Sequence, residues 1–257
     1  MKIFDCFLFF NELELLELRL MTLYDIIDYF VLVEAGATHT GKIKEFHFEN
    51  NKFMFEKYLN KIIYIKIDKL SSDNPYENEG NSRDEMVGGF HQADDDDYII
   101  ISDIDEIPNP KTLSEGISNN YDSFGMLQKL FYYYVNCLSS TDWFGPVVIK
   151  KKHIETPQKT RLKRCLQANF VNDGGWHYSF LGGLEKIKIK LDSFSEQQVN
   201  IIENNNSEHI LKCFKTGEDL FHRTEDCHKK EFIMMEEITH KEVIEWLVKY
   251  PDFYKII

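Results

Sequence analysis

Two aspartates spaced two positions apart, Asp103 and Asp105, are the residues whose type and spacing most strongly suggest chemistry. Side chains alternate along an extended chain, so both carboxylates point the same way, about 7 Å apart at roughly 3.4 Å per residue. A hard divalent cation such as Mg²⁺ or Mn²⁺ takes one or two carboxylates and completes its shell with water and phosphate oxygens. A solvated acidic loop is the commoner explanation of a lone Asp-x-Asp, so the surrounding elements must decide.

The residues before this pair predict a buried strand. Tyr98 to Ile101 form an apolar, β-branched run of the kind that is buried on both faces of a sheet. In an open α/β sheet, ligands bind at the carboxyl ends of the strands, which is where Asp103 and Asp105 fall. The acidic run Asp94 to Asp97 precedes the strand, and we expect it to be a solvated turn at the opposite edge, roughly 14 Å or more from the pair.

Composition narrows the class of protein. With 257 residues, 43% of them hydrophobic, the chain can bury a substantial core. The formal charge of −13 argues against binding a nucleic-acid backbone. There is neither an apolar run of membrane-spanning length nor a signal-peptide cleavage site, so we expect no transmembrane segment and a cytoplasmic location. The cysteines are scattered and lack a C-x-x-C pattern, which favours reduced thiols; they are Cys6, Cys137, Cys165, Cys213 and Cys227.

The first half of the chain alternates strand-like and helix-like segments, which implies a largely parallel sheet with helices on both faces. The expected strands cover residues 2–10, 29–34, 61–67 and 98–101, and the expected helices cover 11–23, 49–58 and 82–93, with a loop at 71–81. Because the carboxyl ends of parallel strands meet at one edge, Glu34 and Asp68 should lie near Asp103 and Asp105.

The second half is less regular. We expect strands at 124–135 and 147–149, a glycine-bracketed aromatic loop at 174–183, a helix starting near 184, loops at 201–206 and at Gly217, and a C-terminal helix at 231–250 that Pro251 ends. No repeat or flexible linker divides the sequence, so residues 1–257 are expected to form a single domain.

Four segments resemble those of glycosyltransferase family 17, the family of the β-1,4-mannosyl-glycoprotein β-1,4-N-acetylglucosaminyltransferase. They are Phe4 to Leu20 (FDCFLFFNELELLELRL), Tyr29 to Lys42 (YFVLVEAGATHTGK), Ile99 to Pro110 (IIISDIDEIPNP) and Gly174 to Gly183 (GGWHYSFLGG). The resemblance runs from about Lys2 to Arg223. It implies a GT-A-type, Rossmann-like, mostly parallel sheet flanked by helices, with a nucleotide-sugar half at about 1–110 and an acceptor half at about 111–257. The animal members carry a membrane anchor that this sequence lacks, which favours a bacterial or viral protein.

The resemblance also implies roles at the acidic pair. Asp103 and Asp105 would meet the ribose and a Mn²⁺ or Mg²⁺ ion that bridges the diphosphate of a UDP-sugar donor. Asp105 is the better candidate for a direct ligand. His177 would complete the metal site or contact the sugar, with His209 and His222 as rival third ligands.

Other residues are expected to bind the nucleotide. Glu34 and the loop after it, including Ala35 and Thr38, would meet the uridine, and Asp68 ends the neighbouring strand. Arg83 would pair with the diphosphate or with the acidic cluster. A satisfied strand-end carboxylate is the alternative for Glu34, and a structural ion pair is the alternative for Arg83.

A β-linked product from an α-linked donor requires inversion, and therefore a general base near the acceptor hydroxyl. Glu185, at the expected helix start, resembles the acidic residue in that place in inverting GT-A enzymes. Asp173 and Glu196 are its competitors. The aromatic residues that could stack on sugar rings, or belong to the core, are Trp143, Trp176 and Tyr178.

We therefore expect a metal-dependent, inverting glycosyltransferase that moves GlcNAc from UDP-GlcNAc to a glycan or glycoconjugate acceptor. Two other classes stay open. Asp103 could be the nucleophile of a haloacid-dehalogenase-like phosphatase, although Glu106 stands where that class has Thr or Val. A non-catalytic carbohydrate-binding protein on a transferase scaffold is the other alternative.

Overall fold

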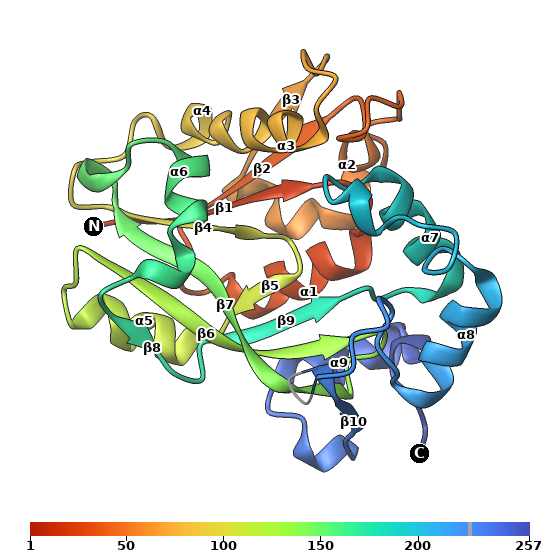
Figure 1. Ribbon diagram of the computed structural model, residues 1–257. Coiled ribbons are helices and arrows are strands. Elements are labelled where there is room, and N and C mark those ends of the chain that lie inside the picture. Colours follow the sequence, from red (N-terminus) through yellow and green to blue (C-terminus); the bar gives the residue numbers. More distant parts are fainter. Residues whose placement is uncertain (226–227) are drawn as a thin grey trace.

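The structure is a computed structural model that describes residues 1–225 and 228–257. Its strands form a 10-stranded sheet with helices packed on both faces (Figure 1). The strands are β1 (Ile3–Phe9), β2 (Tyr29–Ala35), β3 (Ile62–Ile67), β4 (Tyr98–Asp103), β5 (Glu106–Pro108), β6 (Ser123–Tyr132), β7 (Cys137–Lys150), β8 (Phe170–Val171), β9 (Gly175–Ser179) and β10 (Lys230–Phe232).

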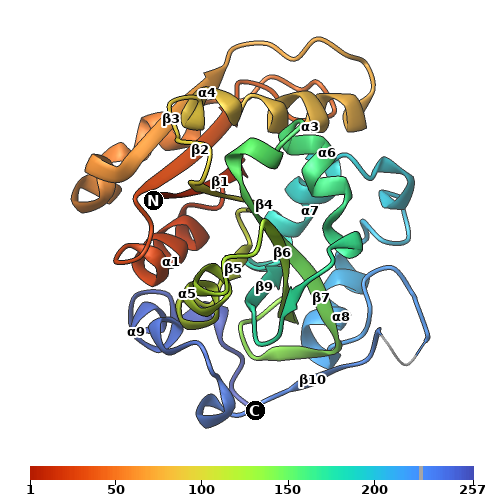
Figure 2. The same ribbon diagram turned by 90° about the vertical axis from the view of Figure 1, so that its left-hand side faces the viewer.

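The α-helices are α1 (Leu13–Leu23), α2 (His47–Asn51), α3 (Pro75–Asp84), α4 (Val87–Phe90), α5 (Pro110–Ser118), α6 (Pro157–Leu162), α7 (Gly183–Ser193), α8 (Ser207–Thr216) and α9 (Lys241–Lys249). Short 3-10 helices are η1 (Lys52–Lys61), η2 (Lys151–His153), η3 (Arg164–Leu166), η4 (Gln197–Val199), η6 (Met235–Glu237) and η7 (Pro251–Phe253). Figure 2 shows α1, α5 and α9 on one side of the sheet and α3, α6, α7 and α8 on the other.

The sheet runs in the order β3-β2-β1-β4-β7-β6-β9-β5, with β10 beside β7 and β8 beside β6. Its first four strands are parallel, as the β–α alternation predicts. Antiparallel pairing begins at β7, which lies between β4 and β6. The predicted α/β class, a mostly parallel sheet flanked by helices, is confirmed.

The central strand β4 is buried on both faces, as its apolar run predicts. Tyr98 and Ile100 pack into a core that also contains α1 and α5, whereas Ile99 and Ile101 pack on the opposite face against α4. The parallel register pairs Leu8 of β1 with Asp103. Because β1 and β4 end at the same level, the acidic pair emerges at the carboxyl edge of the sheet.

Three sequence predictions were wrong. Residues 71–81 are not all loop, because the side chain of Asn74 caps α3 by accepting a hydrogen bond from the Tyr76 amide at 3.0 Å and Pro75 occupies the first turn. The predicted aromatic loop contains a buried strand, β9, that pairs with both β5 and β6. The predicted C-terminal helix is divided into β10, η6 and α9, so that its helical part begins only at Lys241.

The acidic turn before β4 also differs from its prediction. Asp94, Asp95 and Asp96 are exposed, but Asp97 is 2% exposed and its carboxylate accepts hydrogen bonds from the Lys2 amide at 2.6 Å and the Asp94 amide at 2.9 Å. Asp97 therefore fastens the start of β1 to the turn.

Membrane-spanning helices and cysteines can be assessed in the described residues. In that part of the chain, no helix combines the length and the apolar character needed to span a membrane. Four of the cysteines are free there, which agrees with reduced thiols, and Cys227 lies outside the described residues; the four are Cys6, Cys137, Cys165 and Cys213.

Candidate functional site

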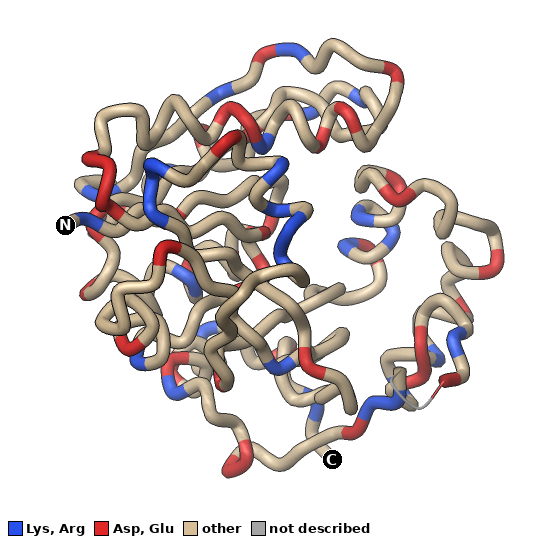
Figure 3. The backbone as a smooth tube through the Cα atoms, turned by 60° about the vertical axis from the view of Figure 1, so that its left-hand side comes forward, with Lys and Arg blue, Asp and Glu red and all other residues tan. Residues whose placement is uncertain are grey.

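A cavity of about 410 Å³ opens at the carboxyl edge of the sheet. The ends of β1, β2 and β4 form its floor, and residues of α3, α6 and α7 line it above the sheet. Lys and Arg occur both in the α6–η3 segment and in α7, two of the elements that contribute to its walls (Figure 3). The charged and imidazole residues that line it are Glu12, His39, Lys44, Glu79, Arg83, Asp103, Asp105, Arg161, Arg164, His177, Lys190 and Glu196.

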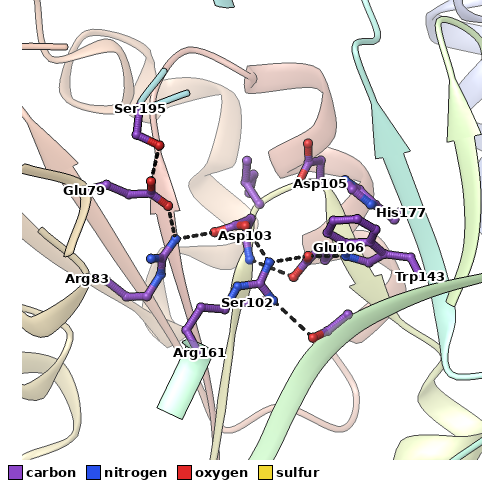
Figure 4. A network of polar contacts seen from close by, with 12 residues as sticks. Glu79, Arg83, Ser102, Asp103, Asp105, Glu106, Trp143, Arg161, His177 and Ser195 are labelled. Carbon is purple, nitrogen blue, oxygen red and sulfur yellow. Dashed lines mark hydrogen bonds and ion pairs between the residues drawn. The ribbon is translucent and has the colours of Figure 1, made fainter. Parts of the chain in front are cut away.

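Asp103 is held between two arginines (Figure 4). Its Oδ1 accepts a hydrogen bond from Arg83 Nη2 at 2.8 Å, and its Oδ2 accepts one from Arg161 Nη2 at 2.7 Å. Desolvation opposes the charge of Asp103, yet Arg161 and Arg83 hold the pKa of this carboxyl well below its usual value. Both oxygens are thus engaged by cationic side chains of the protein itself.

Glu106 fixes this arrangement from below. The side chain is fully buried, and its carboxylate accepts hydrogen bonds from Arg161 Nη2, from Trp143 Nε1 at 2.6 Å and from the Asp103 amide at 3.1 Å. Arg161 in turn donates to the Gly145 carbonyl at 3.1 Å. Glu106 therefore positions both Arg161 and the backbone of the acidic motif.

Asp105 faces different partners. Its Oδ2 lies 2.9 Å from Lys190 Nζ, and its Oδ1 lies 3.6 Å from His177 Nε2. Burial opposes ionisation of Asp105, but Lys190 and His177 hold the pKa of its carboxyl well below the usual value. The Lys190 side chain is 31% exposed, so this partner lies closer to solvent than the arginines at Asp103, whose side chains are 3% and 6% exposed.

The backbone brings His177 to Asp105. The Tyr178 amide donates to the Asp105 carbonyl at 2.8 Å, and β9 pairs with β5 so that His177 stands opposite Glu106. This close approach needs Gly175, since a Cβ there would lie 2.1 Å from the Ile107 carbonyl oxygen. A glycine in the aromatic segment thus aligns the histidine with the acidic motif.

These donors fit a divalent cation at Asp105 better than at Asp103. No group of three His, Cys, Asp or Glu within the described ranges is placed to hold a metal by itself. Mg²⁺ is commonly bound through one or two carboxylates plus substrate phosphates, and Asp105 with His177 offers that kind of partial shell. Asp103, with an arginine on each oxygen, does not. The rival histidines His209 and His222 stack on each other at 4.1 Å and do not line the cavity.

The predicted nucleotide-binding residues separate into two sets. Ala35, Thr38 and Arg83 line the cavity, whereas the exposed Asp68 does not. Glu34 is fully buried outside the lining, and its carboxylate is satisfied by Lys44 Nζ at 2.8 Å, the Tyr64 hydroxyl at 2.8 Å and two amides of the α2 start. The geometry of Glu34 agrees with the structural alternative for this residue.

The two general-base candidates with the strongest sequence support are not brought into the cavity. Glu185 is exposed in the first turn of α7, and the exposed Asp173 accepts a hydrogen bond from Asn109 Nδ2 through its main-chain carbonyl at 3.1 Å. Neither residue lines the cavity, whereas Glu196 does. Glu12 also lines it, with Oε2 accepting from the Asn11 amide at 3.0 Å.

Sequence reasoning missed the residues that partner the acidic pair. Arg161 and Lys190 contact carboxylates 58 and 85 positions away in the chain, so no local spacing links them to the motif. Glu79 was missed as well; it pairs with Arg83 at 2.7 Å and accepts a hydrogen bond from Ser195. Of the aromatic candidates, Trp143 lines the cavity, while Trp176 and Tyr178 are buried beside His240 and belong to the core.

Comparison with known proteins gives one match over nearly the whole chain. The profile of the family described as glycosyltransferase family 17 matches residues 1–256. None of the curated proteins matches the sequence. Among solved structures, the chain is similar to a crystal structure of 4-diphosphocytidyl-2C-methyl-D-erythritol synthase, with a TM-score of 0.39 and 10% sequence identity over 66% of this chain and 89% of the other.

Proposed function

The chain belongs to glycosyltransferase family 17, and from this premise we propose that it transfers GlcNAc from UDP-GlcNAc to a glycan or glycoconjugate acceptor, with inversion and a β linkage. The observation that carries the proposal is the position of Asp105, which lies in the turn directly after the central strand β4 and contacts Lys190 in the lining of the cavity. Ligands of open α/β sheets bind at this edge.

The cavity lining has mixed charge, and two of its cationic side chains suit a diphosphate. The chain as a whole has a formal charge of −13, so an anionic donor needs a local concentration of positive charge. Lys190 enters the cavity from α7, and the Arg164 guanidinium lies 5.4 Å over the Trp143 ring. We assign Lys190 and Arg164 to the diphosphate, because the Nη groups of Arg83 and Arg161 are already engaged by carboxylates and by other acceptor oxygens.

A divalent ion, Mn²⁺ or Mg²⁺, would be held by Asp105 with His177 as its neighbour, and when bound it would neutralise charge that develops on the leaving diphosphate. Asp103 would act through the arginines that it positions. Its carboxylate holds Arg83 on one side and Arg161 on the other, and this keeps the wall of the cavity charged and rigid.

The nucleoside would lie on the loop after β2. Ala35 and Thr38 line the cavity there, and their small side chains leave room for a ring. Glu34 holds the following segment in place through Lys44 and the amides of His47 and Phe48. We therefore propose that Glu34 supports the uridine loop from within the fold.

Transfer needs one displacement. The acceptor hydroxyl oxygen forms a bond to the anomeric carbon, the bond from that carbon to the diphosphate oxygen breaks, and the hydroxyl proton passes to a carboxylate. We propose Glu196 as that base, because it lines the cavity and its carboxylate forms no hydrogen bond or ion pair with other described residues. Glu185 stays a prediction, and its position outside the lining makes it the matched comparison.

A pair of glutamine substitutions tests this assignment. Glu196→Gln should lower the rate of sugar transfer by about 10²- to 10⁴-fold, the usual contribution of a general base, while UDP binding measured by calorimetry is unchanged. Glu185→Gln should transfer at the wild-type rate. The reverse pattern would move the base to Glu185 and would leave the transferase assignment intact.

Donor use is the test of the proposed function as a whole. A panel of nucleotide sugars, incubated with Mn²⁺, with Mg²⁺ or with a chelator, should show metal-dependent hydrolysis or transfer with UDP-GlcNAc as the preferred donor. Turnover of another nucleotide sugar would correct the donor only. Glycan binding without turnover of any donor would overturn the proposal in favour of a carbohydrate-binding protein. Simple phosphate esters in the same panel test for a phosphatase, which the engagement of both Asp103 oxygens disfavours.

A further inference from the structure

The Lys190 ammonium group occupies a position on the Asp105 carboxylate that a metal cation could otherwise take. Lys190 Nζ lies 2.9 Å from Asp105 Oδ2, on the carboxylate that best fits a divalent ion. Within the described residues, the ion pairs of Asp105 are those with Lys190 and His177. An ammonium group and a divalent cation cannot both be bound closely by this oxygen, because they repel each other and compete for the same lone pairs.

Lys190 can leave Asp105 without disturbing the fold. Its side chain is 31% exposed, and a lysine ammonium sits on a flexible four-carbon stem. The end of α7 that carries it is held by another contact, because Thr40 Oγ1 donates to the Asp192 carbonyl at 3.1 Å. The η4 segment that follows α7 is held in turn by the Tyr76 hydroxyl, which donates to Gln198 Oε1 at 2.9 Å. The end of α7 therefore stays against the loop after β2, and η4 stays against α3, while the ammonium moves.

We propose that Lys190 is a resident counter-ion of the donor site, which neutralises Asp105 when the site is empty and transfers to the donor diphosphate when the divalent cation binds Asp105. This inference rests on the proposed function, since it assumes a nucleotide-diphosphate donor. In the empty site, Arg83 and Arg161 neutralise Asp103, and Lys190 neutralises Asp105. Without Lys190, the buried charge of Asp105 would lack its closest cationic partner. Lys190 also places a positive charge beside the leaving group.

This role has a signature that simple structural damage does not produce. If Lys190 competes with the metal and also binds the diphosphate, its removal must tighten metal binding and weaken nucleotide binding. A substitution that merely disturbed the cavity would weaken both. The two affinities can be measured separately, with Mn²⁺ alone and with UDP at saturating Mn²⁺, by calorimetry or by the electron paramagnetic resonance signal of free Mn²⁺.

The test compares Lys190→Met with Lys188→Met. Both lysines lie on α7, but Lys188 bonds to Ser207 Oγ at 3.0 Å and does not line the cavity. Lys190→Met should bind Mn²⁺ about tenfold more tightly and UDP about tenfold more weakly, each change corresponding to roughly 1.4 kcal/mol. Lys188→Met should leave both affinities unchanged. Lys190→Arg keeps the charge and should restore most of the UDP affinity.

The failures of the two proposals can be told apart. If wild type binds Mn²⁺ and UDP but Lys190→Met binds both as wild type does, or binds both more weakly while the variant melts at the wild-type temperature, the role of Lys190 is wrong and the proposed function stands. If wild type binds UDP equally well with chelator, metal binding does not send Lys190 to the diphosphate, and the proposed role of Lys190 is wrong. If wild type binds neither Mn²⁺ nor any nucleotide, the proposed function fails, and the inference fails with it.

Discussion

Asp103 and Asp105 leave the same strand end two positions apart, yet they lie in two different environments. Asp103 faces Arg83 and Arg161, whose side chains are almost completely buried, and the amide of Asp103 is bound by the buried Glu106. Asp105 faces a histidine at 3.6 Å and a half-exposed lysine at 2.9 Å. The Asp103 side chain is 36% exposed, but each of its oxygens is bound by a buried arginine, whereas Asp105 is 8% exposed and has partners that can move.

The difference shows that an Asp-x-Asp spacing does not by itself assign two equal ligands. Asp103 ends β4 and Asp105 lies in the turn after it, so a turn and not the predicted alternation of an extended chain brings both carboxylates to one edge. The partners that arrive from α3, α6 and α7 then separate their roles. We infer that Asp103 maintains the shape and charge of the cavity and that Asp105 is the carboxylate whose partner, the partly exposed Lys190, can give way to a ligand.

The substitution Asp105→Asn should have the largest effect, which is a loss of turnover. Loss of this carboxylate should lower kcat/KM for the donor by about 10³-fold, because metal-ion catalysis contributes several kcal/mol of charge stabilisation. Loss of the ion pair with Lys190 should also lower the melting temperature, so turnover is compared at a temperature at which the variant is folded. Asp142→Asn, at an exposed carboxylate paired with Lys129, is the control and should have wild-type activity. Activity of Asp105→Asn within a factor of a few of wild type would contradict the role of Asp105.

The next effect is on stability and belongs to the Asp103 region. Arg161→Met leaves Glu106 and Asp103 without their shared partner, so the free energy of unfolding should fall by about 3–5 kcal/mol, as for other broken buried pairs. Urea denaturation measures this. Lys159→Met, in the same helix but at an exposed position, should change it by less than about 0.5 kcal/mol. Equal effects of the two substitutions would show that the network around Asp103 is not a structural one.

The pH dependence of the free energy of unfolding should distinguish the acidic pair from a third buried group, His240. Burial of His240, which stacks on Trp176 at 3.8 Å, lowers its pKa to about 3, so the folded protein keeps the ring neutral while the unfolded chain takes up a proton. Above about pH 6.5 this ring does not lower the free energy of unfolding. Below that pH, the free energy of unfolding falls by roughly 1.4 kcal/mol per pH unit as the pH falls toward 3. Asp103 and Asp105 have lowered pKa values, so their contributions persist above about pH 4 and are lost below it.

Unfolding free energies at pH 7, 5 and 3.5 therefore test two separate windows. His240→Gln should flatten the decline between pH 7 and 5, and Asp103→Asn should flatten only the decline below about pH 4. A decline between pH 7 and 5 that is the same in wild type and His240→Gln would contradict the assignment to His240. Asp103→Asn that flattens this upper window would show that the carboxylate titrates near neutrality.

The smallest effect is expected for His177→Gln. The imidazole lies 3.6 Å from Asp105, which is a weaker contact than that of Lys190, and its Nδ1 is buried without a hydrogen-bond partner in the described structure. Loss of a supporting residue of this kind should weaken Mn²⁺ binding by about tenfold, which is at the low end for residues next to a metal ligand. Titration of activity with Mn²⁺ measures it. A loss as large as that of Asp105→Asn would make His177 an equal ligand.

Much of the frame was predictable because its signals are local. Residues close together in the sequence determine three of these features. They are the apolar run of β4, the strand–helix alternation before it and the start of α7 at Gly182-Gly183. The errors have equally physical causes. The N-cap at Asn74 determines where α3 begins, and the aromatic segment becomes a strand because β5 and β6 pair with its backbone on both sides.

The site was predictable only in part. The acidic pair was singled out by residue type and spacing and Arg83 and His177 by the family resemblance; the structure places all four in the lining of one cavity, and their roles stay predictions. Arg161 and Lys190 were not found, because an ion pair across 58 or 85 residues leaves no spacing in the sequence. Their contacts, which separate the roles of Asp103 and Asp105, exist only after the sheet and α7 have assembled.

The most direct measurement is an anomalous difference map at the manganese absorption edge, from a crystal of the protein with Mn²⁺ and UDP. We predict one peak beside Asp105 and the diphosphate, with Arg83 and Arg161 still on Asp103 and with Lys190 turned from Asp105 to the diphosphate. A peak bound by Asp103 with its arginines displaced would contradict the division of roles between the two carboxylates. A peak and a nucleotide away from this cavity would contradict the site.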